Sequence, residues 1–513
     1  MKGAKNKTME LKIFRDTICA MGPVCEAKAE LPLEAEILIP DYLPQVFKVV
    51  KCFVHLVPLQ KQISMGRLTV EGYLRCVVYY QAEQEQALCQ TEQKIPFTRA
   101  MELPQAEYNT CSIQVSGQVE YLNCRALNQR RLDVRGAYAL NARIAVRKEQ
   151  EVVTALAECG IEQKMTAVPA MRPLLSVDKL ITAEETIQFA KQPQAILDAA
   201  GVGHVEEIKL VSGKAVVKGK IQVSLLYRGE ESTQLEVVEQ SVPFNQILDT
   251  ESLPQDSESF ACVEMTGCTL MTASGQELSA QITVTAMLHL RIWRSGECYL
   301  VEDAFSTQYE TQLTEQKIFT EQLACPLNQT GTGQFQVNLP DEEGQVVHCF
   351  AQPVSVELAQ QEGKLVLQGR AYGHLLCLNS LGEMDCCDKA FEYQIPLSLE
   401  GEPQQYRLEC WPTVTGIETT VEQGQATVKV QWQLEGLVFR RTQQTIVVDV
   451  TCTDPLEQQQ PDIALRIYYA KAGEHLFDIA KRYHLPPADL MKANEFEQPV
   501  LEQAQRLLIP STV

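Results

Sequence analysis

The sequence predicts a multidomain, mostly β protein, with three antiparallel sandwich-like or barrel-like repeats and a small α+β module at the C-terminus. Three observations support this fold class. One glycine-framed stretch occurs three times, apolar and polar residues alternate within each copy, and helical spacing dominates only in the last fifty or so residues. The length of 513 residues suits three or four domains.

The recurring stretch is Gly66–Gly72, Gly213–Gly219 and Gly363–Gly369, at intervals of 147 and 150 residues. So long a period indicates copies of a whole domain rather than a solenoid of small units. Apolar side chains then occupy every second position for about twelve residues, which is typical of a half-buried strand. The second glycine of each copy indicates a bulge or a close approach of a neighbouring strand.

Each copy therefore has a predicted buried face. These faces are Leu68, Val70, Leu74, Cys76 and Val78 in the first copy, Ala215, Val217, Ile221, Val223 and Leu225 in the second, and Leu365, Leu367, Ala371 and Leu375 in the third. Further landmarks follow at similar offsets, namely Ile95-Pro96-Phe97, Val242-Pro243-Phe244 and the shorter Ile395-Pro396. Successive strands joined by short polar loops favour antiparallel sheets.

We expect repeat one to span residues 1–155, repeat two 160–308 and the more divergent repeat three 312–452. Prolines and a glutamine run predict a linker at 453–463, followed by the small module at 464–513. Local signals predict short helices at Thr182–Glu185 and Gln194–Leu197. They also predict a loop at Asn328–Gly333 and a junction between repeats at Val168–Pro173.

Composition narrows the function classes. The apolar fraction of 45% and the charged fraction of 22% are ordinary for a folded protein, and the net charge of −21 argues against nucleic acid or anionic lipid as a partner. No apolar run is long enough for a transmembrane helix. The basic start is not followed by an apolar run of signal-peptide length, which predicts a protein kept in the cytoplasm.

No catalytic residue set, cofactor motif or metal motif is recognisable. The 18 cysteines form no Cys-x-x-Cys pair, and Cys386-Cys387 is the one adjacent pair, so we interpret the cysteines as small core residues. Gly201-Val202-Gly203 and Gly331-Thr332-Gly333 lack the third glycine of a phosphate-binding loop. The sequence thus predicts a protein that is not an enzyme, although a site without a motif stays as an alternative.

The C-terminal pattern predicts a β-α-α-β unit. A strand at 465–470 precedes a helix with Leu476, Ile479 and Ala480 on one face, and Pro486-Pro487 separates this helix from a second one. Asn494 is expected to end the second helix in a left-handed conformation, before a returning strand at 507–510.

This unit resembles the LysM module over roughly residues 466 to 511, through Tyr469-x-x-x-x-Gly473 and the residues that follow, and through Gln505-x-Leu507-x-Ile509-Pro510. The resemblance implies a shallow groove between two loops that binds N-acetylglucosamine-containing glycans. The matching groove positions are Gly473, Glu474, His475, Leu476, Phe477 and Asn494. His475 stands where the family usually has Thr or Ser, and Phe477 where it usually has Trp, which weakens the expectation of glycan binding.

The three repeats resemble the SPOCS domain of spore-coat proteins, whose hallmarks are a Gly-Lys-x-x-Val-x-Gly strand and a later Pro-Phe turn. Gly213–Gly219 and Pro243-Phe244 keep these hallmarks best. Such domains followed by one LysM module are similar to the SipL-like spore coat morphogenetic proteins. The resemblance implies a non-catalytic scaffold in the mother-cell cytoplasm at the forespore surface, with its LysM-like module bound to a SpoIVA-like ATPase and possible contacts to other coat proteins. The alternative is a peptidoglycan-binding or cortex-glycan-binding protein.

Overall fold

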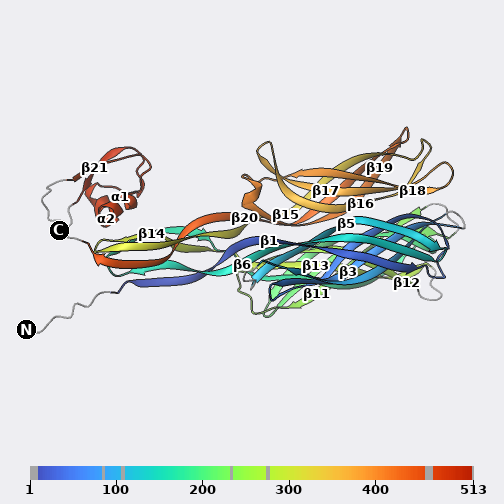
Figure 1. The fold of residues 1–513 in the computed structure, drawn as a ribbon, viewed down its shortest axis with the longest axis horizontal. Helices are drawn as coiled ribbons and strands as arrows, with labels where there is room; N and C mark the ends of the chain where they lie inside the picture. Colours follow the sequence, from blue (N-terminus) through green and yellow to red (C-terminus); the bar gives the residue numbers. More distant parts are fainter. Residues whose placement is uncertain are drawn as a thin grey trace, which may run out of the picture.

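The computed structural model describes residues 10–83, 87–104, 110–230, 235–272, 278–456 and 466–510. Long antiparallel strands make up the body of the molecule, and both described α-helices lie in the small C-terminal module (Figure 1). The predicted fold class is confirmed. Neither of these helices is long and apolar enough to cross a membrane.

The body repeats one strand plan three times. The first third contains β1 (Lys12–Leu38), β2 (Val46–Ser64), β3 (Arg67–Ala82), β4 (Leu88–Glu102), β5 (Thr110–Asn128) and β6 (Arg131–Ala157). The second contains β7 (Ile161–Pro169), β8 (Arg172–Gln188), β9 (Pro193–Val211), β10 (Lys214–Gly229), β11 (Leu235–Asp249), β12 (Glu258–Thr272), β13 (Ser279–Arg294) and β14 (Glu297–Ser306). The third contains β15 (Tyr309–Asn338), β16 (Gln345–Gln361), β17 (Lys364–Leu378), β18 (Met384–Pro396), the short 3-10 turn η1 (Pro403–Gln405), β19 (Tyr406–Glu422) and β20 (Gln425–Pro455).

Most equivalent strands pair in the same way in every third. The long opening strand pairs with the closing strand (β1 with β6, β8 with β13, β15 with β20), and the closing strand also pairs with the strand before it. The three intervening strands form a meander, which is a separate three-stranded sheet in the first and third thirds and joins the main sheet through β9 and β12 in the second. Each third has its own large apolar core, and the predicted buried faces all line these cores.

The glycine-framed stretch is a hairpin turn followed by a strand. Met65 and Gly66 both have positive φ, at 49° and 73°, and Glu362 and Gly363 repeat this pattern at 51° and 80°. Two consecutive residues of positive φ are what a tight two-residue hairpin between twisted strands requires. The second glycine allows the predicted close approach, because a Cβ atom at Gly72 would lie 2.3 Å from the Val57 carbonyl oxygen.

The proline of the recurring Pro-Phe or Ile-Pro landmark lies on an edge strand in each copy. Pro96, Pro243 and Pro396 belong to β4, β11 and β18, each of which is the outermost strand of its sheet. Proline has no N–H to offer to a further strand, so a proline here hinders edge-to-edge pairing with another chain. The landmark is therefore explained by protection of the sheet edge.

The outer ends of the long strands extend beyond the three cores as a narrow stalk. β1 with β6, β7 with β14, and β15 with β20 contribute one strand pair each (Figure 1). Apolar residues from all three pairs form shared clusters, which include Val152, Val168, Leu300 and Ile446. The stalk thus ties the three thirds together along the chain's own long strands.

Four local expectations are wrong. Thr182–Glu185 and Gln194–Leu197 lie in β8 and β9, because Ile181, Ala183 and Ile187 alternate toward the core while β8 pairs with β13. Asn328–Gly333 lies in β15, where Gly331 and Gly333 leave room for the side chains of Ile395 and Phe391. Val168–Pro173 is no junction but spans the end of β7 and the start of β8, and the chain turns instead at Glu158–Gly160, with positive φ at all three residues.

The predicted linker at 453–463 differs in part from the structure. Strand β20 runs to Pro455, where it pairs with Tyr309, so the first three linker residues belong to the stalk. Residues 457–463 lie outside the described residues.

Candidate binding module and the interface that carries it

The C-terminal module is a compact β-α-α-β unit. Its strands β21 (Arg466–Ala470) and β22 (Gln505–Ile509) pair in antiparallel fashion, and helices α1 (Leu476–Arg482) and α2 (Pro487–Ala493) pack beside them. The core is formed by Leu476, Ile479, Ala480, Leu490, Leu507 and Ile509, with further residues around them. Helix α2 starts directly after Pro486 with Pro487 in its first turn, where a missing N–H costs nothing.

The first loop of the module is ordered by its own side chains. Gly473 has a φ of 85° with open space around it. The Glu474 carboxylate accepts a hydrogen bond from the Lys471 backbone N–H at 2.9 Å and another from the Tyr468 hydroxyl at 3.0 Å, and the former lowers the pKa of Glu474 most. His475 caps helix α1, because its Nδ1 accepts a hydrogen bond from the Phe477 N–H at 3.1 Å. That nitrogen carries no proton in this arrangement.

The second loop is held by Asn494. Its side-chain amide donates to the carbonyls of Leu490 at 2.9 Å and Leu508 at 2.8 Å, and its Oδ1 accepts the Leu508 N–H at 2.7 Å. The expectation of a left-handed Asn494 is wrong, since its φ is −116° and the positive φ of 57° falls on Glu495. The side-chain bonds explain the difference, because they fix Asn494 between α2 and β22.

The two loops pair with each other. The Gly473 N–H donates to the Leu501 carbonyl at 2.7 Å, and the Leu501 N–H donates to the Glu474 carbonyl at 3.0 Å. The Leu476 N–H donates to the Pro499 carbonyl at 2.7 Å, and His475 forms a bridge with Val500. These backbone groups of the expected groove are therefore already engaged within the module.

The six expected groove residues separate into two groups. Gly473 is exposed, and Glu474, His475 and Asn494 are partly exposed on the loops. Leu476 and Phe477 are buried, at 0% and 4% exposure. Leu476 fills the module's core, whereas Phe477 packs against the body.

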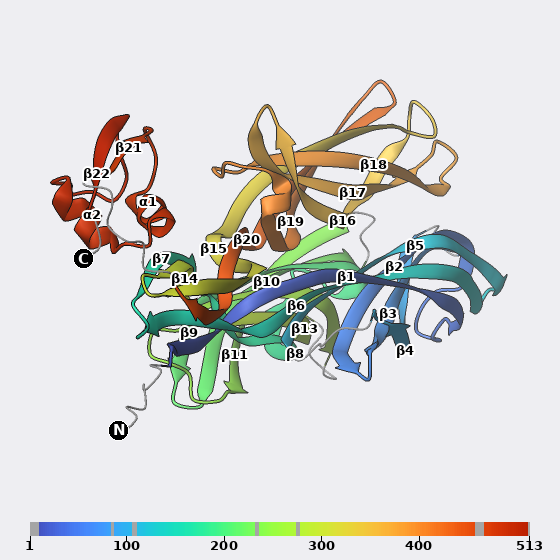
Figure 2. The same ribbon diagram turned by 60° about the vertical axis from the view of Figure 1, so that its left-hand side comes forward.

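Helix α1 docks on the tip of the stalk (Figures 1 and 2). The Phe477 ring meets Phe305 of β14 edge-on, with ring centroids 5.2 Å apart, and Phe305 belongs to the same apolar cluster as the module's core. Lys481 donates to the Asp303 carboxylate at 2.5 Å, and the His484 ring lies 3.3 Å from the Ser306 carbonyl oxygen. The module is thus oriented by the second repeat.

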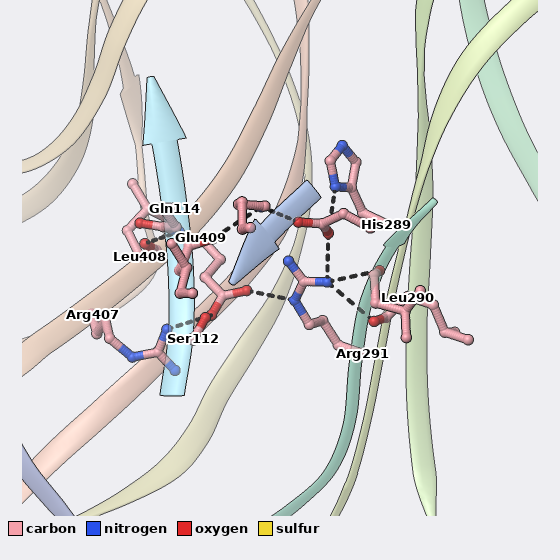
Figure 3. A network of polar contacts seen from close by, with 12 residues as sticks. Ser112, Gln114, His289, Leu290, Arg291, Arg407, Leu408 and Glu409 are labelled. Carbon is pink, nitrogen blue, oxygen red and sulfur yellow. Dashed lines mark hydrogen bonds and ion pairs between the residues drawn. The ribbon is translucent and has the colours of Figure 1, made fainter. Parts of the chain in front are cut away.

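Deep in the body, a polar network joins all three thirds (Figure 3). Glu409 of β19 accepts from Arg291 of β13 at 3.0 Å and from Ser112 of β5 at 3.1 Å. Arg291 also donates to Asp178 of β8 at 2.9 Å, and Lys61 of β2 pairs with the same carboxylate. One set of charges therefore connects three regions that are over a hundred residues apart in the sequence.

The charges in this network offset the cost of burial. Burial by itself would raise the pKa of Glu409, but Arg407 and Arg291 outweigh it and hold the pKa at about 2. Burial opposes ionisation of Asp178 as well, yet the hydrogen bond from His289 and the charges of Lys61 and Arg291 keep its pKa far below the usual range. Buried carboxylates that stay ionised in this way hold their partners in fixed positions.

An apolar seam lies beside the network. Phe53, Val77, Tyr79 and Leu88 of the first third pack with Leu197 of the second and with Leu376 and Met384 of the third. The Tyr79 hydroxyl donates to the Leu197 carbonyl at 2.9 Å. The signature strands are buried on both faces here, one against their own core and one against the other repeats.

Sequence reasoning missed the network. Asp178, Arg291 and Glu409 are separated from their partners by 113 and 118 residues, so no local spacing reveals them. Trp432 packs in the core of the third repeat, Trp293 packs with Leu437 and Phe439 between repeats, and Trp411 stacks on His289 at 4.6 Å beside the network. The sequence offered one indication of the network, namely that His289 and Arg291 interrupt the otherwise apolar closing strand of repeat two.

Comparison with known families gives two matches. The family model described as "SipL, SPOCS domain" matches residues 45–127 and 193–271, which correspond to β2–β5 and β9–β12. The LysM domain model matches residues 468–510. No curated protein and no solved structure matches the chain. The third repeat is outside these matches, and its kinship with the others rests on the shared strand plan.

Proposed function

As a sporulation-related chain with SipL-type SPOCS domains and a LysM module, this protein is, we propose, a non-catalytic scaffold of spore coat assembly. Its module binds a coat morphogenetic ATPase of the SpoIVA type at the forespore surface. The main observation behind this proposal is that the deeply buried charged side chains pair with one another between repeats. Arg291 pairs with Asp178 and with Glu409 of the third repeat, and Lys61 and Ser112 join the first repeat to these carboxylates, which is the chemistry of a rigid support.

The module's free surface supports a protein partner. Backbone hydrogen bonds join its two loops. The backbone groups of Gly473, Glu474 and Leu476 that could bind a sugar therefore already have partners within the module. Large apolar side chains are exposed instead on the outer face of the two-stranded sheet, with Ile467 at 48% and Tyr469 at 69%. Tyrosine beside arginine is a common composition for a protein-binding surface, and Arg506 lies 5.6 Å from the Tyr469 ring.

Co-purification of the full chain with the ATPase tests the proposal. We expect retention by the unaltered chain and loss of retention in Tyr469→Asp, which alters the outer sheet face, or in Val500→Asp, which alters the loop side. The matched control is Tyr299→Asp, an exposed tyrosine on β14 of the body at 62% exposure. The proposal would be contradicted if both module variants were still retained. It would also be contradicted if the Tyr299→Asp control lost retention as completely as they did.

Glycan binding is the second candidate, because the LysM domain match favours it. In this case the full chain would sediment with purified peptidoglycan, and a change beside the loops such as Val500→Asp would prevent sedimentation. The protein-partner proposal predicts no sedimentation of either chain. The two assays together separate the candidate functions, because co-purification measures binding to the ATPase and sedimentation measures binding to peptidoglycan.

A further inference from the structure

Three side chains with different metal-binding atoms converge at the edge of the third repeat. His374 of β17 lies directly across from Asp388 of β18, and Cys386 precedes Asp388 by two positions, on the same face of the strand. Asp388 Oδ1 lies 2.8 Å from His374 Nδ1 and 3.3 Å from Cys386 Sγ. All three potential ligand atoms lie within 4.8 Å of one another.

We propose that His374, Cys386 and Asp388 form a binding site for a divalent transition-metal ion of the Zn²⁺ class. Imidazole nitrogen, thiolate sulfur and carboxylate oxygen are the three ligand types that Zn²⁺ accepts in proteins. A mixed set with sulfur and nitrogen does not suit Ca²⁺ or Mg²⁺, which prefer oxygen ligands only. Solvent supplies the fourth position, because the Asp388 side chain is 42% exposed.

The surroundings fit a metal centre in two further ways. The His374 side chain is 9% exposed and packs on the Phe53 ring, with centroids 4.8 Å apart, which fixes the orientation of the imidazole. Lys51 of β2 pairs with the second oxygen of Asp388 and so leaves Oδ1 directed at the other two ligands. The fixed imidazole and the position of Oδ1 favour metal binding, whereas the positive charge of Lys51 opposes it.

Binding requires one proton to leave. Burial and the charge of Asp388 raise the pKa of Cys386, so the free site holds a thiol. On binding, the S–H bond breaks, its proton passes to solvent and the sulfur forms a bond to the metal, with no change in oxidation state. The proton that His374 Nδ1 directs at Asp388 Oδ1 also leaves, and Nε2 is protonated in its place, so that Nδ1 can bind the ion. The thiolate and Asp388 then balance the two charges of the ion, and Lys51 is left as a nearby positive charge that opposes binding.

Titration of the full chain with Zn²⁺ and Cd²⁺ tests the site. We expect calorimetric Zn²⁺ binding and, with Cd²⁺, the ultraviolet charge-transfer band of a cadmium–thiolate bond. Cys386→Ser should abolish the band and weaken Zn²⁺ binding by more than about 100-fold, since even supporting residues change affinity by 10–100-fold. The matched control is Cys387→Ser, whose sulfur lies on the opposite side, 3.8 Å from Cys377 Sγ.

Lys51→Met separates this site from adventitious binding by another thiol. Removal of the nearby positive charge should strengthen Zn²⁺ binding at His374, Cys386 and Asp388, whereas binding elsewhere would not respond. No Zn²⁺ binding by the full chain, an unchanged cadmium band in Cys386→Ser, or an unchanged affinity in Lys51→Met would each overturn the proposal. This second variant keeps the test decisive if Cys386→Ser fails to fold.

Discussion

The body and the C-terminal module are joined to their surroundings in different ways. The three thirds of the body contact one another through the stalk, an apolar seam and a buried ion network. The module contacts the body through α1 and His484, which follows shortly after this helix. It is also electrically neutral, with six basic and six acidic side chains in residues 466–510, so the net charge of −21 belongs to the rest of the chain. The difference indicates a rigid support that carries a detachable binding unit.

Substitution of the network should have the largest effect. Glu409→Ala leaves Arg291 and Arg407 buried without their shared partner, and removal of one member of a buried ion pair costs about 3–5 kcal/mol. Urea unfolding of the full chain measures this loss. The control is Glu102→Ala, whose partner Arg67 is 63% exposed, with an expected cost of about 0.5 kcal/mol. Equal costs for the two variants would show that the network does not hold the body together.

Acid should weaken the body next. A carboxyl whose pKa falls from 4.5 to about 2 on folding contributes stability that is complete above pH 4.5 and is lost as the pH falls toward 2. For Glu409 this difference amounts to about 3 kcal/mol. Urea unfolding at neutral pH and in acid measures it, and Glu409→Gln should show a smaller loss in acid than the unaltered chain. If both chains lost the same free energy of unfolding in acid, groups other than Glu409 would be responsible for the loss.

Part of this architecture follows from the sequence and part does not. The buried faces around Leu68, Val217 and Leu367 follow from strict alternation, because each strand has one face on its own core. The helix signals at Thr182–Glu185 failed because pairing of β8 with β13 outweighs local preference. The packing of the thirds could not be predicted, since Arg291 and Glu409 meet only after folding. The LysM fold was predicted, but its docked Phe477 depends on Phe305, which is distant in the sequence.

Loss of the docking ring should release the module without unfolding the body. Phe305→Ala removes the edge-on partner of Phe477, with an expected loss of about 2 kcal/mol from burial and ring contact. Small-angle X-ray scattering of the full chain should then show a longer maximum dimension. Tyr299→Ala, a change of an exposed residue on the same strand, should leave the scattering unaltered. A compact Phe305→Ala chain would mean that the remaining polar contacts suffice for docking.

The smallest expected effect concerns the helix cap. His475→Ser places a better capping residue before α1 and should stabilise the module by about 0.5 kcal/mol, with no change in the body. Hydrogen exchange of the α1 amides measures this gain. Slower exchange in α1 is expected, and faster exchange would show that the imidazole does more than cap the helix.

The claim that the three repeats form one unit is tested most directly by calorimetry of the full chain. We expect the body to unfold in a single transition, with a calorimetric enthalpy equal to the van't Hoff enthalpy, because the stalk, the apolar seam and the buried charges join its three thirds. Separate transitions for the three repeats, each insensitive to Glu409→Ala, would contradict it.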